Sequence, residues 1–407
     1  MARRIGQGNP PDALRISKYP VIILVVLVST VIAVVPGRFL GFSSSGWGWF
    51  IPVLFSAYTI LRSKRGVSFP VFIWLPWVLF LLVQLVMTDF QALQRTAQLI
   101  TPIAVGMAVS TVALNEWMLA GLNRIFRRYS LLIAFLMVAK TGMLWTGILP
   151  ATTGLAAEVM ITTLFAVYYA ASYAVRRKLI DLYYWCIMAM MPVFALTRAA
   201  IAVTGLTLPL TLGPIRPLYR IVIIVTGLAM ASALFYSDRF QNKMFSYTGG
   251  QGEISDLLEG NVADHSRFYM WRMFGHALEQ KSVWGYGAGE GEKYTRSITN
   301  GRLQYPHNDY LLTRFDFGWV GLLRYLLTSV YMFWHAFRRS WGKHGEVKIL
   351  FLTGAGAFIP LWMLMGSDNI MVYAAYWGNL HFMILGLAYS TMRKVPSIKH
   401  YENSSRP

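Results

Sequence analysis

The sequence has one cysteine and few charged residues, and both shortages narrow the class of protein. Cys186 is the only thiol among 407 residues, so the chain can form neither an intrachain disulfide nor a cysteine-based metal site. Charged residues make up 14%, whereas a soluble globular domain has about a quarter. Hydrophobic residues make up 56% and the mean hydropathy is +0.46, which excludes an ordinary soluble protein.

Acidic residues are scarce as well. The chain has 18 Asp and Glu against 37 Lys and Arg, which gives a formal net charge of +19. The basic residues form short clusters between apolar stretches and no extended patch, so nucleic-acid binding is not expected. Because cytoplasmic loops keep an excess of Lys and Arg, these clusters predict that both termini are cytoplasmic and that residues 237–308 lie on the outer side.

The sequence consists largely of long apolar runs, and most of these runs are long enough to cross a hydrocarbon core of about 30 Å as helices. They predict an all-α polytopic integral membrane protein with about 12 transmembrane helices and one large, partly helical outer loop. Transmembrane helices 1–9 fall within residues 1–236, the loop is 237–308, and helices 10–12 with a cytoplasmic tail fall within 309–407. The predicted spans are 19–36, 46–61, 69–87, 97–116, 130–149, 153–175, 179–196, 199–213, 217–236, 309–336, 347–366 and 370–391.

No internal repeat is evident in the sequence, although many secondary transporters carry two matching halves. The apolar spans nevertheless contain a few charged residues, namely Lys140, Glu158 and Asp181. Lys140 and Glu158 either pair with each other or line a substrate path, as they would in a transporter. Both interpretations remain open.

The outer loop contains a predicted helix that begins near Asp264, with Asp264 or Ser266 as its cap. Arg267 lies in the first turn, where backbone N–H groups and the helix dipole favour an anion. Aromatic and small residues then recur at helical spacing, which indicates a packing face, with sugar stacking as the alternative. This stripe consists of Phe268, Trp271, Phe274, Gly275 and Leu278.

A glycine-rich stretch follows in the run VWGYGAGEGEKY, with Gly285, Gly287, Gly289 and Gly291. No strand pattern precedes it and no Lys-Ser or Lys-Thr follows it, so it does not fit a nucleotide-binding loop. The glycines instead predict a tight turn that passes close to another backbone segment.

The loop ends in the run QYPHNDY, where His307 follows a proline and precedes Asn308 and Tyr310. A neutral imidazole can take a proton from a hydroxyl near pH 7, and neighbouring polar groups can orient its ring. His307 is therefore the candidate general base, with a purely structural histidine as the alternative.

Three of these segments resemble the O-antigen ligase family of polytopic, C-type-like membrane glycosyltransferases. They are LTRAA with Arg198, HSRFYMW with the WGYGAGEGE turn, and PHNDYLLTRFDFGWVGLL. The resemblance implies an enzyme of lipopolysaccharide biosynthesis in the bacterial inner membrane, with its active site facing the periplasm. Its donor would be a glycan on undecaprenyl pyrophosphate and its acceptor a sugar hydroxyl of lipid A-core. The O-antigen polymerase uses the same donor and is the alternative, and a lipid-linked glycan transporter is the alternative of a different class.

The resemblance also implies roles for the candidate residues. His307 would be the base of an inverting transfer, and Arg198 and Arg267 would bind the leaving pyrophosphate, although either arginine can instead be an interfacial anchor. Asp368, in the run MGSDN, would orient His307 or simply cap a helix. Asn308 and Tyr310 would support the site.

No cofactor and no metal are expected. Related multi-span transferases often place an acid pair in the first outer loop, but residues 36–46 contain no carboxylate. The outer segments also lack closely spaced His and acid ligands in a metal pattern. The expected partners are the lipid-linked donor, the lipid A-core acceptor and membrane lipid, and no nucleic acid.

Overall fold

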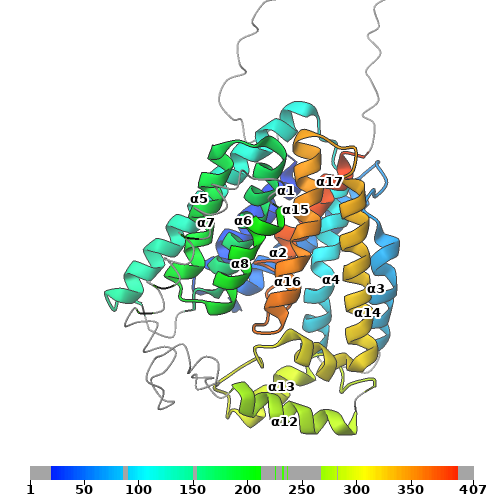
Figure 1. The fold of residues 1–407 in the computed structure, drawn as a ribbon. Coiled ribbons are helices and arrows are strands. Elements are labelled where there is room, and N and C mark those ends of the chain that lie inside the picture. The colour runs from blue at the N-terminus through cyan, green and yellow to red at the C-terminus, as the bar shows by residue number, and fades with distance from the viewer. Residues whose placement is uncertain are drawn as a thin grey trace, which may run out of the picture.

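The described part of the protein is a bundle of roughly antiparallel helices (Figure 1). The computed structural model describes residues 20–85, 90–149, 154–211, 267–281 and 283–392, together with positions 225, 232 and 236. The elements before the outer loop are α1 (Val21–Val34), β1 (Arg38–Phe39), β2 (Phe42–Ser43), α2 (Ser44–Arg62), α3 (Val71–Gln84), α4 (Phe90–Ser110), α5 (Glu116–Trp145), α6 (Ala156–Arg176), α7 (Leu179–Phe194) and α8 (Arg198–Thr211). The later elements are α12 (Arg267–Gln280), α13 (Glu290–Ile298), α14 (Asp309–Arg339), α15 (Gly345–Gly356), α16 (Phe358–Met365) and α17 (Gly378–Ser390).

Two helices form the centre of the bundle. Every residue of α6 from Glu158 to Ser172 is buried, and so is every residue of α17 from Asn379 to Ser390. A helix that is apolar on all sides is stable only when other elements surround it. Accordingly, α17 packs against α4 and α15, while α6 packs against α7, α8 and α15.

The outer surface of the bundle is apolar and fits a membrane protein. Helices α5 and α6 and the nearly continuous pair α15–α16 are long and apolar enough to cross a membrane, and α1, α3 and α7 are shorter apolar helices. Large apolar side chains such as Phe135 and Leu327 are exposed on the surface of the bundle. Such exposure is costly in water and suits contact with lipid.

Each predicted span that falls in the described residues contains a helix, but several boundaries are wrong, and the largest errors are at the starts of three helices. Helix α4 begins at Phe90 and not at 97, α5 begins at Glu116 and not at 130, and α17 begins at Gly378 and not at 370. The first turns of α4 and α5 are polar, so hydropathy alone missed them, and the Asn115 side chain caps α5 by accepting from the Met118 N–H at 3.0 Å. The span predicted at 217–236 lies outside the described residues apart from its three isolated positions, so the number 12 stays a prediction.

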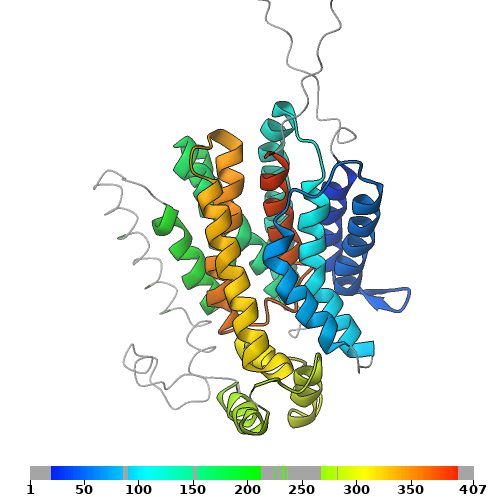
Figure 2. The ribbon, with the colours of Figure 1, turned by 90° about the vertical axis from the view of Figure 1, so that its right-hand side faces the viewer.

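Helices α12 and α13 lie across one end of the bundle, and Figure 2 shows them beside the first turns of α14. The connections 35–43, 195–197 and 366–377 reach the same end, because the chain reverses direction at each helix. The connections at the opposite end carry Lys64, Arg65, Arg177, Lys178 and Lys343. The basic clusters are thus separated from α12 and α13. The predicted division at 236 and 308 stays a prediction, since residues 237–266 lie outside the described part.

The charged residues within the spans are paired. Lys140 donates to Glu158 at 2.7 Å, and Asp181 accepts from Arg127 at 2.7 Å and from Arg176 at 3.2 Å. Glu158 and Asp181 are completely buried. A buried charge is tolerated when it has a partner of opposite sign, so these contacts favour the pairing interpretation over a substrate path.

Candidate active site

The glycine-rich turn packs against a kink in α14. Gly318 has a left-handed backbone (φ 66°) and interrupts the helix. The carbonyls of Phe315 and Asp316 therefore accept from the N–H groups of Tyr286 and Gly287, both at 2.8 Å. A Cβ atom on Gly318 would overlap the Val283 carbonyl. The predicted tight approach to another backbone is confirmed, and it fixes the loop onto the first half of α14.

A small apolar core joins α12 to the same half of α14. It contains Met270, Phe274 and Leu278 of α12 with Phe315 of α14, and Trp271 packs at its edge. The packing interpretation is therefore confirmed for Trp271, Phe274 and Leu278. Gly275 is an exception, because none of the described atoms lies within 4 Å of a Cβ atom built on it. The side chain of Phe268 and the proposed caps Asp264 and Ser266 lie outside the described residues.

His307 stands directly before α14 in a strained conformation. Its φ of 51° is left-handed, which is uncommon for a residue other than glycine and costs free energy. The next residue, Asn308, caps α14, because its side-chain oxygen accepts from the Leu311 N–H at 3.0 Å. The sharp turn followed by a capped helix fixes the position of the imidazole at the start of α14.

A second segment, the turn 366–369 between α16 and α17, is bound to His307 from the other side. The His307 N–H donates to Oδ1 of Asn369 at 2.7 Å, and Nδ2 of Asn369 donates to Oδ1 of Asp309 at 3.3 Å. The buried Asp309 also accepts from the Met371 N–H at 2.6 Å. Both ends of the Asn369 amide are thus used to join the 366–369 turn to the first residues of α14.

This clamp places Asp368 beside the imidazole. Oδ1 of Asp368 lies 3.4 Å from Nδ1 of His307, and the same oxygen accepts from the Asn369 N–H at 2.8 Å. The distance to His307 exceeds the usual 2.7–3.2 Å of a strong hydrogen bond. The two side chains are 30% and 21% exposed, so the pair can be reached from outside the protein. The sequence-predicted neighbours His307 and Asp368 are therefore brought together.

Arg267 contacts the same turn, and Arg198 lies near Arg267. Arg267, the first residue of α12, donates from Nη1 to the Ser367 carbonyl at 3.1 Å. Arg198, the first residue of α8, is half-buried and near enough to Arg267 for the two positive charges to repel each other. Trp271 fixes α12 to the segment before His307 by donating to the Pro306 carbonyl at 2.8 Å. Two neighbouring guanidinium groups can form charge-assisted hydrogen bonds to one anion.

The supporting residues have structural contacts. The Tyr310 hydroxyl donates to the Trp362 carbonyl at 2.7 Å, and Asn308 acts as the helix cap described above. Sequence analysis missed Asn369, Asp309 and Arg95. Arg95 of α4 is only 5% exposed, and its Nε lies 3.8 Å from Oδ2 of the fully buried Asp316. The polar residues at helical spacing in the first turns of α4 indicate a polar face that includes Arg95. No feature of the sequence distinguishes Asn369.

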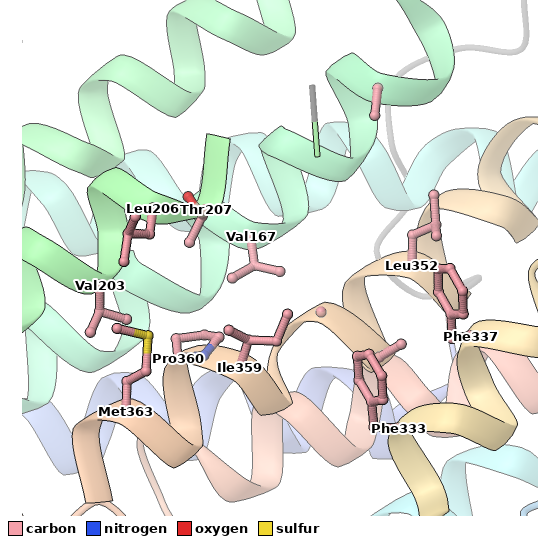
Figure 3. Close-up of a pocket in the computed structure, with 13 residues that line it drawn as sticks. Val167, Val203, Leu206, Thr207, Phe333, Phe337, Leu352, Ile359, Pro360 and Met363 are labelled. Carbon is pink, nitrogen blue, oxygen red and sulfur yellow. The ribbon is translucent and has the colours of Figure 1, made fainter. Parts of the chain in front are cut away.

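An apolar cavity of about 330 Å³ lies between α6, α8, α14, α15 and α16 (Figure 3). Helix α8 contributes Val203, Leu206 and Thr207 to it, and α16 contributes Pro360 and Met363. Both helices continue to the polar site, since α8 begins at Arg198 and α16 ends just before the 366–369 turn. Within the described residues, no group of three or more His, Cys, Asp or Glu could hold a metal ion.

Residues 183–326 match the family model described as O-antigen ligase. The chain carries an O-antigen ligase domain. The resemblance seen in the sequence is thereby confirmed, and the domain indicates a ligase- or polymerase-type enzyme of O-antigen processing. The matched region contains Arg198, Arg267 and His307, whereas Asp368 and Asn369 lie beyond it. No curated protein matches this chain.

Proposed function

We propose that this protein is an O-antigen ligase, which transfers polysaccharide from undecaprenyl pyrophosphate to a sugar hydroxyl of lipid A-core. The observation that carries the proposal is the contact between His307 and Asp368 at 3.4 Å, with Arg267 bound to the neighbouring Ser367 carbonyl. A proton acceptor and a cationic group therefore meet at one turn. This is the combination that glycosyl transfer from a pyrophosphate requires.

His307 is the base in this proposal. Nδ1 faces Asp368, which favours the tautomer with the proton on Nδ1 and leaves the lone pair on Nε2. Nε2 takes the proton of the acceptor hydroxyl while the hydroxyl oxygen bonds to the anomeric carbon of the donor. The bond from that carbon to pyrophosphate breaks on the opposite face, the bonding electrons leave with pyrophosphate, and the configuration is inverted. Asp368 stabilises the imidazolium that forms.

Arg198 and Arg267 bind the departing pyrophosphate. Each guanidinium offers several N–H donors in a planar fork, and charge-assisted hydrogen bonds to phosphate are stronger than neutral ones. The two guanidinium groups lie near each other, which supports an anionic ligand, because both can donate to the same pyrophosphate. The reaction is proposed to need neither a cofactor nor a metal ion.

The two ends of the bundle support a placement in the membrane. We assign the end with α12 and α13 to the periplasm and the basic end to the cytoplasm of the bacterial inner membrane, as cytoplasmic connections are rich in Lys and Arg. The apolar cavity beside α8 supports the lipid-linked donor, because a prenyl chain needs an apolar path that starts near its pyrophosphate.

The polymerase is the second candidate, since it uses the same donor and would need the same groups. In the test, purified protein is incubated with one lipid-linked glycan as donor. The acceptor is either lipid A-core or a second lipid-linked glycan. Product on lipid A-core alone supports the ligase, and product on the second lipid-linked glycan alone supports the polymerase. A transporter would move the donor across a vesicle membrane and form neither product.

A further inference from the structure

A polar pocket of about 410 Å³ lies between the first turns of α4 and the α13 region. Its α4 wall consists of Gln91, Gln94, Arg95 and Gln98, and its opposite wall of Glu292, Arg296 and Gln304. From this pocket we infer a saccharide-binding subsite next to the His307 region. The inference rests on the proposed function and adds to it the place where the sugar chain of a substrate is held.

The α4 wall is built by helical spacing. Its four residues are separated by three, one and three positions, so they lie on one face of α4. The flanking face carries the buried Ala92, Thr96 and Leu99, which pack into the bundle. Arg95 and Gln98 are buried and Gln94 is exposed, so the polar face runs from the interior of the bundle to its surface. Together the four side chains of this wall present three amides and one guanidinium to the same space.

Arg95 shows that this space is built for a ligand with hydrogen-bond acceptors. It is 5% exposed, and its Nε, Nη1 and Nη2 atoms have no hydrogen-bond partner among the residues that the structure describes. Buried donors without partners cost free energy, which a ligand in the pocket can recover. The charge of Arg95 is already balanced, since its Nε lies 3.8 Å from the buried carboxylate of Asp316.

The opposite wall supplies both acceptors and donors. Glu292 Oε1 accepts from Arg296 Nη2 at 2.8 Å and from Gln304 Nε2 at 2.8 Å. Gln304 Nε2 also donates to the Tyr305 hydroxyl at 3.0 Å. Burial raises the pKa of Tyr305, so the phenol stays neutral.

The charges distinguish this pocket from the pyrophosphate site. Arg296 is paired with Glu292 and Arg95 with Asp316, so the lining carries little net charge. At the pyrophosphate site, in contrast, two arginines, Arg198 and Arg267, lie near each other. A near-neutral pocket rich in amides suits a ligand with many hydroxyl groups, because an amide can donate to one hydroxyl and accept from another.

The pocket is also adjacent to the reaction centre. Gln304 and Tyr305 lead through the buried Pro306 directly to His307, and Asp316 lies in the same half of α14. A sugar chain that reacts at His307 could therefore extend toward α4. Both the donor glycan and the acceptor core are saccharides, and the same chemistry would bind either one.

The test measures binding of free oligosaccharides to purified protein in detergent by saturation-transfer NMR. The two probes are lipid-free core oligosaccharide and a lipid-free O-antigen fragment. Gln94→Leu and Gln98→Leu each remove one amide, and Gln94 is exposed, so its replacement does not disturb the core. The double variant is expected to bind one of the probes at least about tenfold more weakly, as two hydrogen bonds are lost. The probe affected identifies the source of the saccharide.

The matched control is Gln84→Leu, which removes an amide at the end of α3, outside the pocket lining. It should bind both probes like the wild type. Unchanged binding of both probes in the Gln94→Leu/Gln98→Leu variant overturns the subsite, as does a wild type that binds neither probe. If the wild-type protein transfers no glycan but the double variant still binds a probe more weakly than the wild type, the subsite is supported and the proposed function is rejected.

Discussion

The main-chain N–H of His307 donates to the side-chain oxygen of Asn369 at 2.7 Å. The same amide donates to Asp309, so one side chain holds together the two segments that carry His307 and Asp368. The spacing between the imidazole of His307 and the carboxylate of Asp368 therefore depends on Asn369. The side-chain amide of Asn369 bonds to the His307 main chain and to Asp309.

Replacing Asn369 by Ala should lower kcat for glycan transfer by about 10- to 100-fold, because a small displacement of a catalytic group has a large effect on rate. The free energy of unfolding should also fall by about 1–3 kcal/mol, since the buried Asp309 loses a donor. Steady-state kinetics and thermal unfolding in detergent measure both effects. Asn300→Gly is the control, because glycine suits its left-handed backbone (φ 50°). Full activity of Asn369→Ala would show that the clamp is not needed.

His307→Ala should lower transfer by about 10²- to 10⁴-fold, the usual contribution of a general base, and leave folding and donor binding nearly unchanged. His276→Ala is a matched control, as His276 is a 66% exposed histidine on α12. Turnover and donor affinity should be measured on the same preparations. Wild-type turnover in His307→Ala would remove the base assignment.

Arg198→Ala and Arg267→Ala should each impair transfer strongly, and the two Lys variants should recover only part of the activity, because an ammonium lacks the planar fork. The donor KM is expected to rise more than the acceptor KM. Arg272→Ala, an exposed position on α12, controls for the loss of one positive charge. Complete recovery by Lys at either site argues against bidentate pyrophosphate binding there.

The sequence predicted the helices and the principal candidate residues because their signals are local. An apolar run of about 20 residues can be seen without knowing its neighbours. His307 and Arg267 likewise stand in recognisable short runs. The first turns of α4 were missed because Gln91, Gln94 and Arg95 lower the hydropathy of a helix that is nevertheless continuous.

The contacts between distant segments were not predictable in the same way. Asn369 meets His307 across a separation of 62 residues, and nothing local distinguishes it from any other turn asparagine. Arg95 meets Asp316 across a still longer separation. The kink at Gly318 was also missed, since its need for glycine comes from the approach of Val283.

Gly318→Ala should destabilise the protein far more than Gly342→Ala. Both glycines have left-handed backbones, with φ of 66° and 69°, so both variants carry a backbone cost of about 1 kcal/mol. A Cβ atom at Gly318 also overlaps the Val283 carbonyl, whereas none of the described atoms lies within 4 Å of one at Gly342. Thermal unfolding in detergent should separate the two variants clearly. Equal melting temperatures would contradict the close packing at the kink.

Transfer by the purified protein should survive exhaustive chelation, because Arg198 and Arg267 already supply positive charge to the departing pyrophosphate. The assay compares rates in detergent before and after treatment with a chelator, with added Mg²⁺ or Mn²⁺ as a further arm. Unchanged rates in all arms are expected. If the chelator stops transfer and a divalent ion restores it, loop acids such as Asp264, Glu290 or Glu292 become candidate ligands. The two arginines would then share the stabilisation of pyrophosphate with a metal ion, and their Ala variants should respond to the metal concentration.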